Sequence, residues 1–449
     1  MRYEYRVSSI EYQVSSIEKS ELIYFNMHSD IICGLDIGAS SVRAVIGRLE
    51  FTHPKGKNKD SSMAKEEILG YAEAPTKGFS KSVVSNLSLL SDAIEASISK
   101  AEDMAGFRAR KVISNISGAH IRTFQSRGSI HISDRPSEIT KSDISRCIDS
   151  AKFIAMSLDR EQVHLVPVRF FIDDKMEIDE PLGLFGSKLD VDLNIITSLV
   201  TVLQNLTKAI NLAGYEVEDM IVSGAGTALA IFDKQELENG SVLIDVGKEV
   251  TGLTIFVNGR LRDSFYFPFG GDDLTQVLQD KLKIMFEEAE ELKIKYGAIT
   301  RDLTRIDDSE ILMPSLKRME APATKIISKS EIANLLLLKA QAMLEDVHKK
   351  LEPFLKDKKS LPHVSIVGAV ARTDGFIETV EEILNVPVNM ARIKGSDDLK
   401  DISFACSLGL MRYGINKITA RKPRYAPSEA GNAAAKVLSR VKAIFSEYF

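Results

Sequence analysis

Two aspartates in matching surroundings are the residues of this chain best suited to chemistry. Asp36 stands in Leu35-Asp-Ile-Gly-Ala-Ser-Ser41 and Asp245 in Ile244-Asp-Val-Gly-Lys-Glu249, each between two apolar segments. Each pattern predicts a strand, a tight turn and a returning strand. Glycine in such a turn lets the backbone approach a ligand closely, and successive turn amides can bind an anion. A carboxylate at the strand end can hold a hydrated Mg²⁺ beside that anion.

The distance between the two motifs suggests a duplication. Asp36 and Asp245 are 209 residues apart, which is too long for a solenoid repeat but suits two related domains facing one cleft. Two hairpins could hold the phosphates of one nucleotide, with a carboxylate on each side of Mg²⁺. The arrangement resembles the actin-like ATPase superfamily. This resemblance implies an α/β fold of duplicated actin-like (ribonuclease H-like) domains, with ATP and Mg²⁺ in the cleft.

Composition excludes several other classes of protein. The chain has 449 residues, 44% hydrophobic and 27% charged, which predicts a globular protein of two or more domains. Its net charge of −5 argues against nucleic-acid binding. Cys33, Cys147 and Cys406 have no metal or redox spacing, and the histidines are scattered, so we expect a reducing compartment and no zinc site. No apolar run reaches the ~20 residues that span a bilayer.

The segment between the two motifs departs from the usual actin-like order. It resembles the extra subdomain of the bacterial cell-division protein FtsA, which replaces the small actin subdomain and mediates contacts with neighbours. The matching stretches are Gly118-Ala-His-Ile121, Glu138-Ile-Thr140, His164-Leu-Val-Pro-Val168, Glu180-Pro-Leu-Gly-Leu184 and Asn194-Ile-Ile-Thr197. The resemblance to FtsA covers about residues 30 to 449.

Other family motifs complete a predicted nucleotide site. Gly270 and Gly271 stand at a predicted helix N-terminus, where backbone amides favour anions. Glu290 and Lys293 lie one helical turn apart in a motif that reaches the ribose and base in the superfamily; the residues alone would indicate a solvent-facing salt bridge. The full predicted set is Asp36, Gly38, Ala39, Ser40, Ser41, Asp245, Gly247, Lys248, Gly270, Gly271, Glu290, Lys293, Gly368 and Ala369, with Asp36 and Asp245 as metal ligands.

The chain divides into seven predicted parts. They are a disordered extension (1–26), a first actin-like subdomain (27–110 with 401–418), the insert (111–197), a second actin-like subdomain (198–272 with 359–400), an upper subdomain (273–358), a flexible linker (419–433) and an amphipathic helix (434–449). In the extension, a heptad at 5–11 is repeated at 12–18, and Met27 could be the true start. The upper subdomain receives the C-terminal peptide of FtsZ in the family.

The last sixteen residues have apolar side chains at helical spacing with basic residues beside them. A basic amphipathic helix after a polar linker is better explained as lying in a membrane interface than as a core helix. It matches the terminal membrane-targeting helix of FtsA. The residues predicted to bind the membrane are Lys436, Val437, Leu438, Arg440, Val441, Lys442, Ile444, Phe445 and Tyr448.

The resemblance therefore implies a peripheral protein on the cytoplasmic side of the cell membrane. It would form actin-like filaments, anchor the FtsZ ring through the FtsZ C-terminal peptide, and recruit other division proteins. Two alternatives share the fold: a PilM-like pilus assembly platform, which would grip a partner's peptide instead of carrying its own anchor, and a metabolic or chaperone ATPase. A sugar kinase has no need of a tethered basic helix, and a long peptide-binding region of the Hsp70 type is missing from the sequence.

The nucleotide loops depart from the family pattern. Ser41 replaces a phosphate-neutralising lysine, Lys248 and Glu249 replace two glycines, and Gly368-Ala-Val-Ala371 replaces a Gly-Gly-Gly-Ala turn. Side chains at 249 and 370 would crowd the phosphate cradle, and an inward Glu249 would repel phosphate. Lys248 could restore the charge lost at Ser41. Because no residue is evident that would position the attacking water, we expect ATP binding with slow or undetectable turnover.

Overall fold

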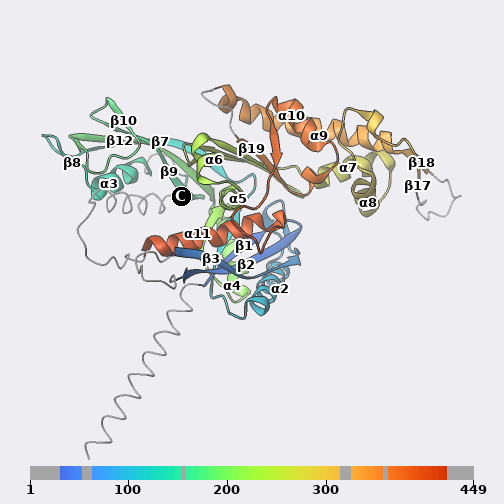
Figure 1. Ribbon diagram of the computed structural model, residues 1–449, viewed down its shortest axis with the longest axis horizontal. Coiled ribbons are helices and arrows are strands. Elements are labelled where there is room, and N and C mark those ends of the chain that lie inside the picture. The colour runs from blue at the N-terminus through green and yellow to red at the C-terminus, as the bar shows by residue number, and fades with distance from the viewer. Residues whose placement is uncertain (1–30, 53–62, 153–156, 314–324, 357–362, 422–449) are drawn as a thin grey trace, which may run out of the picture.

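Two lobes built on similar sheets form the centre of the molecule (Figure 1). The computed structural model describes residues 31–52, 63–152, 157–313, 325–356 and 363–421. The strand order is β13-β6-β1-β2-β3 in the first sheet and β20-β19-β14-β15-β16 in the second. In each sheet the aspartate-bearing strand pairs antiparallel with the next strand and parallel with a strand from further along the chain. The predicted duplication is therefore visible in the topology.

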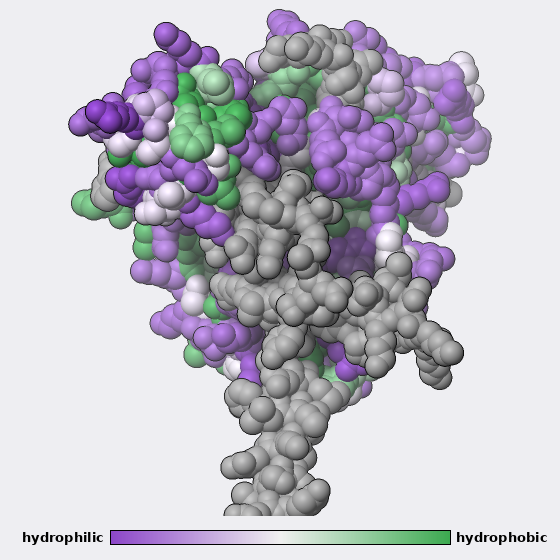
Figure 2. All heavy atoms as spheres, turned by 60° about the vertical axis from the view of Figure 1, so that its left-hand side comes forward, coloured by the Kyte–Doolittle hydropathy of each residue, from purple (hydrophilic) through white to green (hydrophobic). Residues whose placement is uncertain are grey.

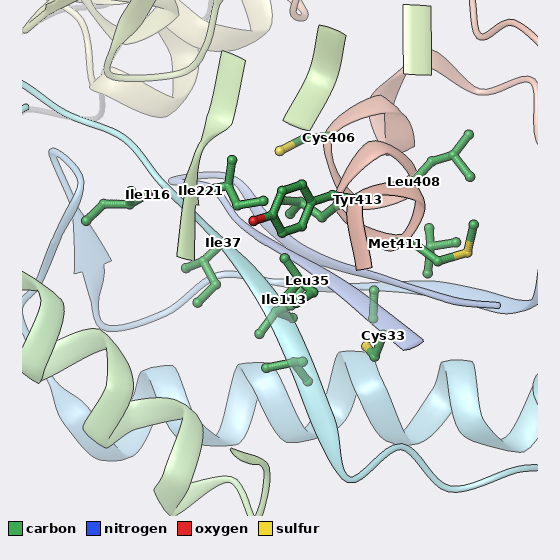
Figure 3. Packing of buried hydrophobic residues seen from close by; sticks show 14 of the residues in the cluster. Cys33, Leu35, Ile37, Ile113, Ile116, Ile221, Cys406, Leu408, Met411 and Tyr413 are labelled. Atoms are coloured by element: carbon green, nitrogen blue, oxygen red, sulfur yellow. The ribbon is translucent and has the colours of Figure 1, made fainter. Parts of the chain in front are cut away.

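The first lobe packs helices on both faces of its sheet. Its elements are β1 (Ile31–Ile37), β2 (Ser41–Thr52), β3 (Met63–Pro75), β4 (Phe79–Ser80), β5 (Val83–Val84), α2 (Leu87–Ala105), β6 (Lys111–Ile116), α4 (Val200–Leu212), β13 (Glu216–Val222), α5 (Ser223–Ile231) and α11 (Ala405–Arg421). Figure 1 shows α11 on one side of this sheet and α2 with α4 on the other. Figure 3 shows the side chains of α11 and of the strands meeting in the core between them.

Gly34 explains why α11 can approach β1 so closely. A Cβ at this position would lie 2.0 Å from the carbonyl oxygen of Ser407 and 2.5 Å from the amide nitrogen of Met411. Only a residue without a side chain fits such a contact. The close packing fixes the position of Cys406, which lies at the end of α11 that faces the second lobe's hairpin.

The second lobe carries the upper subdomain at its far end. The sheet part contains α6 (Lys234–Asn239), β14 (Ser241–Val246), β15 (Thr251–Val257), β16 (Arg260–Phe267), β19 (His363–Val367), α10 (Phe376–Leu384) and β20 (Val388–Met390). The upper part contains α7 (Gly271–Leu282), α8 (Phe286–Tyr296), β17 (Glu310–Met313), β18 (Lys325–Ser328) and α9 (Lys329–Lys356). One hydrophobic core runs through both parts, because buried residues of α7 and α9 pack with those of β14 and β19.

The insert has a four-stranded sheet of its own, a helix, and a small two-stranded sheet. It comprises β7 (Arg122–His131), β8 (Ser137–Glu138), α3 (Lys141–Lys152), β9 (Arg160–Ile172), β10 (Met176–Ile178), β11 (Phe185–Gly186) and β12 (Lys188–Leu199), with the strand order β10-β9-β12-β7 in the larger sheet and β11-β8 in the smaller one. Leu189, Val191 and Leu193 of β12 are buried in the core that includes residues of α3. The alternate residues Asp190 and Asp192 belong to the opposite face.

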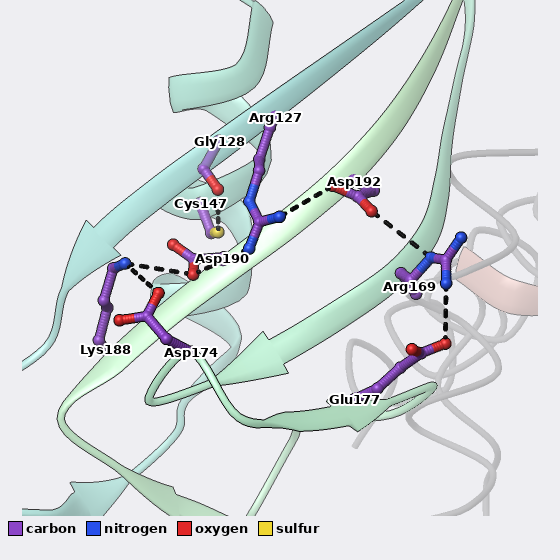
Figure 4. Close-up of polar contacts among 9 residues, drawn as sticks. All are labelled: Arg127, Gly128, Cys147, Arg169, Asp174, Glu177, Lys188, Asp190 and Asp192. Atoms are coloured by element: carbon purple, nitrogen blue, oxygen red, sulfur yellow. Dashed lines mark hydrogen bonds and ion pairs between the residues drawn. The ribbon is translucent and has the colours of Figure 1, made fainter.

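Ion pairs cover that opposite face of the insert (Figure 4). Asp190 lies 3.3 Å from the ammonium of Lys188 and 3.4 Å from the guanidinium of Arg127. Arg127 and Arg169 both reach Asp192. The period of two in β12 thus separates an apolar face under α3 from a charged face, as expected for a sheet covered by a helix on one side.

Two domain boundaries need correction. We assigned residues from 111 to the insert, but β6 pairs with β1 in the first sheet, so the insert's own sheet begins at Arg122. We assigned residues from 198 to the second subdomain, but β13 pairs with β6 and α4 contributes Leu203 and Leu206 to the first core. An apolar strand pattern does not say which sheet the strand joins, and this caused both errors.

The insert also touches the second lobe. The side-chain amide of Asn194 donates to the carbonyl oxygen of Arg262 at 2.6 Å, and the Arg260 guanidinium donates to the carbonyl oxygen of Val168 at 2.8 Å. These bonds join β12 and β9 to the edge strand β16. The insert is therefore connected in sequence to the first lobe and is hydrogen-bonded to the second.

Several predictions concern residues outside the described ranges. These are the extension 1–26, the amphipathic helix 434–449 and all but the first three residues of the linker, which form the end of α11. Within the described residues, none of the helices combines the length and apolarity needed to cross a bilayer.

Candidate functional site

A cleft of ≈ 1040 Å³ between the lobes gathers the predicted nucleotide residues. Those that line it are Asp36, Gly38, Ala39, Ser40, Ser41, Asp245, Gly247, Lys248, Gly271, Glu290, Lys293, Gly368 and Ala369. Gly270 lies directly behind them as the residue before α7. Residues from five separate stretches of sequence thus meet at one place, as the duplication predicts.

The two hairpin turns are closed by the same backbone hydrogen bond. The amide of Gly38 donates to the carbonyl oxygen of Ser41 at 3.1 Å, and that of Gly247 donates to Val250 at 3.0 Å. A Cβ on Gly247 would lie 2.8 Å from the carbonyl oxygen of Val250, so the turn leaves little room for a side chain. Each turn directly follows an aspartate-bearing strand, β1 or β14.

The two aspartates sit close enough together for their charges to interact. Burial raises the pKa of Asp245 to about 6, and the negative charge of Asp36 adds to the rise. Burial also raises the pKa of Asp36, and the positive charge of Arg43 opposes the rise at both carboxyls. Asn115 donates a hydrogen bond to Asp36 at 2.7 Å. Two crowded carboxylates are a suitable half-site for a divalent cation.

The donor set fits Mg²⁺ rather than a metal held by protein alone. In the described part of the chain, no three His, Cys, Asp or Glu side chains come together as a metal cluster. Mg²⁺ commonly takes one or two carboxylates and completes its shell with water and substrate phosphates. Asp36 and Asp245 provide that number, and the turn amides beside them suit the phosphates.

The N-terminus of α7 plays a different part from the one we predicted. The amide of Gly271 donates to the carbonyl oxygen of Gly247 at 2.9 Å, and that of Asp272 donates to Lys248 at 2.8 Å. The amide of Gly270 is taken by the carboxylate of Asp273 at 3.0 Å. These amides are therefore not offered to an anion. They hold the second turn in place instead.

The close contact between the start of α7 and the second turn leaves no room for a side chain at Gly270. A Cβ there would lie 2.5 Å from the carbonyl oxygen of Gly247 and 2.6 Å from that of Lys248. The side chain of Lys248 itself is exposed. Its charge opposes the rise that burial causes in the pKa of Asp272, so a positive charge stands at the rim of the cleft.

Glu290 and Lys293 form an ion pair inside the cleft rather than on an open helix face. The Lys293 ammonium lies 2.6 Å from the Glu290 carboxylate and donates to the carbonyl oxygen of Gly271 at 2.9 Å and to the hydroxyl of Thr275 at 2.8 Å. Only 13% of the Lys293 side chain is exposed. The pair thereby joins α8 to the first turn of α7 and lines the wall of the cleft.

The side chains at 249 and 370, which we expected to crowd the phosphate cradle, have other partners in the structure. Val370 is only 6% exposed and belongs to the core of the second lobe. The carboxylate of Glu249 accepts hydrogen bonds from the hydroxyl of Ser80, at 3.0 Å, and from the amide of Lys81. Glu249 thus reaches across to the first lobe, where two hydrogen-bond donors hold its carboxylate.

Sequence reasoning missed Arg43 and Asn115. Arg43 lines the cleft and is the cross-strand partner of Asp36, so both side chains point to the same face of the hairpin. Counting by two from Ser41 along β2 would have found it. Asn115 is a buried polar residue near the end of β6, and such a residue is a signal for a specific partner.

Comparison with known proteins supports this reading of the fold. One family model, the SHS2 domain inserted in FtsA, matches residues 118–197, and a second, the cell division protein FtsA, matches residues 242–409. FtsA of Pseudomonas aeruginosa is 28% identical over 391 residues, which are 86% of this chain and 90% of that protein. FtsA of Bacillus subtilis is 25% identical over 398 residues, which are 88% of this chain and 86% of that protein.

Solved structures show the same architecture at low identity. The PilM–PilN type IV pilus biogenesis complex matches with a TM-score of 0.58 at 15% identity, over 86% of this chain and 98% of that chain. MreB5 of Spiroplasma citri bound to AMPPNP matches with a TM-score of 0.51 at 14% identity, over 87% and 97%. These likenesses speak for the fold alone, and they give the pilus-platform alternative no further support.

The insert predicted from five short motifs and the two lobes predicted from two hairpins are thus confirmed by independent matches along the chain. The FtsA matches span both lobes and the insert between them. The chain belongs to the FtsA family of cell-division proteins and has an actin-like fold with an inserted SHS2 domain.

Proposed function

We propose that this cell-division protein binds ATP with Mg²⁺ between its lobes, assembles into filaments on the cytoplasmic face of the cell membrane, and anchors the FtsZ ring there. The observation that carries the nucleotide part is the pair of matching hairpin turns, each following an aspartate, that face one cleft.

The described residues suggest how the nucleotide would be held. Asp36 and Asp245 would bind Mg²⁺, and the turns at 38–41 and 247–248 would contact the phosphates. Glu290 and Lys293 would face the ribose and base. The bound cation would neutralise charge on the phosphates. Arg43 and Lys248 add positive charge from opposite sides of the cleft.

We expect hydrolysis to be slow or undetectable. Nucleotide hydrolases of other folds position the attacking water with a polar side chain, such as a glutamine. The side chains that line this cleft, within the described ranges, include no glutamine and no histidine. The site suits nucleotide-dependent assembly better than rapid turnover.

The surfaces of the insert and of the upper subdomain are available for partners. Figure 2 shows a mainly hydrophilic face with an apolar area at its upper left. The insert exposes Met176, Leu184 and Phe185, which suits self-association. The upper subdomain exposes Ile326 and Leu338, and its helices carry basic residues such as Lys281. This combination is suited to the mixed apolar and acidic C-terminal peptide of FtsZ.

Membrane binding rests on the amphipathic pattern of residues 434–449. An interfacial helix buries only part of each apolar side chain, and each basic residue adds about 1 kcal/mol on an anionic leaflet. A single tail should therefore bind weakly. Linking many tails in a filament raises their effective concentration without any new contact. Binding should consequently be salt-sensitive and rise steeply with protein concentration.

Co-sedimentation with anionic liposomes tests this proposal. The full chain should sediment with the vesicles and carry FtsZ with it, whereas a chain truncated to residues 1–430 and the variant Phe445→Glu should stay in solution. Ser439→Glu is the matched control, because it adds the same charge on the opposite side of the predicted helix. Unchanged liposome binding by Phe445→Glu would contradict the membrane anchor. Loss of binding in both Glu variants would mean that the added negative charge, and not the lost apolar side chain, prevents binding.

A further inference from the structure

Glu249 is the one residue of the second turn whose side chain bonds to the opposite lobe in the described part of the chain. Its two carboxylate oxygens accept from the Ser80 hydroxyl, at 3.0 Å, and from the Lys81 amide. Ser80 ends β4 of the first lobe, and Glu249 lies between β14 and β15 of the second. Glu249 is 169 residues from Ser80 and 168 from Lys81 in sequence. Because the partners belong to different lobes, these hydrogen bonds form only when the lobes are close together.

The turn that receives Glu249 has an unusual backbone. Lys81 and Ser82 have φ values of 48° and 61°, in the left-handed region that L residues seldom adopt in succession. The turn is anchored beneath by Phe79, which is 8% exposed, and by a contact of 3.1 Å between the hydroxyls of Ser82 and Ser117. The backbone amide of Lys81 in this turn donates its hydrogen bond to Glu249.

We propose that Glu249 is a clasp across the mouth of the cleft, and that its release from Ser80 and Lys81 controls how fast nucleotide enters and leaves. The proposal rests on nucleotide binding in the cleft. The cleft is lined by the turns of both lobes, so separation of the lobes would loosen the contacts of a bound nucleotide with both turns at once. Glu249 directly follows Lys248, so its bond to the first lobe spans the cleft at the phosphate end.

The chemistry of Glu249 favours a clasp over a nucleotide contact. A carboxylate is an acceptor only and gains nothing from phosphate oxygens, which are acceptors as well. With a hydroxyl and a backbone amide, in contrast, it forms charge-assisted bonds, which are stronger than neutral ones. The sequence therefore places at this position a side chain suited to gripping protein donors.

Kinetics separate the clasp from simple repulsion of phosphate. If Glu249 only repelled phosphate, its removal would speed binding and slow release. If it is a clasp, its removal speeds both, and the equilibrium constant changes less than either rate, because opening precedes entry as well as exit.

The experiment is stopped-flow binding and chase of a fluorescent ATP analogue with Mg²⁺, using the full chain. Glu249→Ala should release nucleotide about fivefold to tenfold faster than the parent, and Ser80→Ala about twofold to threefold faster, since it removes one of two bonds. The control Glu95→Gln, on the exposed side of α2, should match the parent. Release that is unchanged or slower in Glu249→Ala overturns the clasp.

A second measurement needs no nucleotide. Hydrogen exchange of the turn containing Lys81 should be faster in Glu249→Ala than in the parent, because its amide loses an acceptor. Equal exchange in both proteins contradicts the clasp. If the parent itself binds no nucleotide, the proposed function is wrong. If the parent binds nucleotide and the variants release it at the same rate as the parent, only the clasp is wrong.

Discussion

Replacing Asp245 by asparagine is expected to stabilise the protein against unfolding at neutral pH when no divalent cation is present. Burial raises the pKa of Asp245 to about 6 from 3.8, and Asp36 adds to the rise. The folded protein therefore holds a proton more tightly than the unfolded chain. Its stability falls as pH rises from about 4 to about 6 and stays low above that range. Asparagine has nearly the same shape and no charge, so it removes this cost.

The size of the effect follows from the shift. A rise of about two pKa units corresponds to about 3 kcal/mol at full strength. Asp245 faces a cleft open to solvent, and screening reduces the gain to about 1–2 kcal/mol at pH 7.5. About half of that gain should remain at pH 5, where the folded parent is mostly protonated at this position.

Urea unfolding followed by circular dichroism measures the gain, since the chain has no tryptophan for fluorescence. The parent, Asp245→Asn and the control Asp92→Asn, at an exposed position of α2, would be compared in EDTA at pH 7.5 and pH 5. Addition of Mg²⁺ and ATP should then stabilise the parent more than Asp245→Asn. The reasoning that burial and the charge of Asp36 raise the pKa of Asp245 would be refuted by either of two results. One is a variant no more stable than the parent in EDTA at pH 7.5, and the other is an equal gain in stability at both pH values.

Two further changes test other parts of the cleft. Lys248→Ala should weaken Mg²⁺–ATP binding about tenfold in calorimetry, and more than Ser41→Ala does, because a charged partner contributes more than a hydroxyl; equal affinity in both variants would disprove compensation by Lys248. Gly368→Ala should lower the free energy of unfolding by about 1–3 kcal/mol more than Gly214→Ala. Both glycines have positive φ, 101° and 90°, but only at Gly368 would a Cβ meet a neighbour, the carbonyl oxygen of Val246 at 2.2 Å. If both variants lost a similar free energy of unfolding, the turn at Gly368 would have to shift easily to make room for the Cβ.

Local patterns predicted the strands and turns better than the sheets they form. The apolar segments flanking Asp36 and Asp245 became β1, β2, β14 and β15 because alternation and turn residues act over a few positions. The pairing of β6 with β1 depends on contacts across about 80 residues, and nothing within β6 specifies its neighbour. The start of the helix α2 at Leu87, by contrast, is set locally, because the Asn86 side chain caps it.

The cleft was predictable and the roles of single side chains in it were not. A duplicated motif predicts that two turns face each other, and they do. The position of the second turn decides whether the amides of Gly271 and Asp272 are free to bind a ligand. Carbonyl oxygens of that turn accept hydrogen bonds from both amides. Arg43 escaped notice because the family places its lysine at the position of Ser41, whereas cross-strand pairing with Asp36 brings Arg43 into the cleft.

The substitutions in the nucleotide loops need not abolish binding, because the fold directs their side chains to other partners. A glutamate in place of glycine at 249 would repel phosphate if it faced inward, but its carboxylate is engaged by Ser80 and Lys81 of the other lobe. A valine in place of glycine at 370 packs into the second core, where only 6% of it is exposed. The backbone of the turn from Gly247 stays supported by α7. A loop that departs from its family pattern can therefore keep its cradle, and in this chain it gains a bond between the lobes.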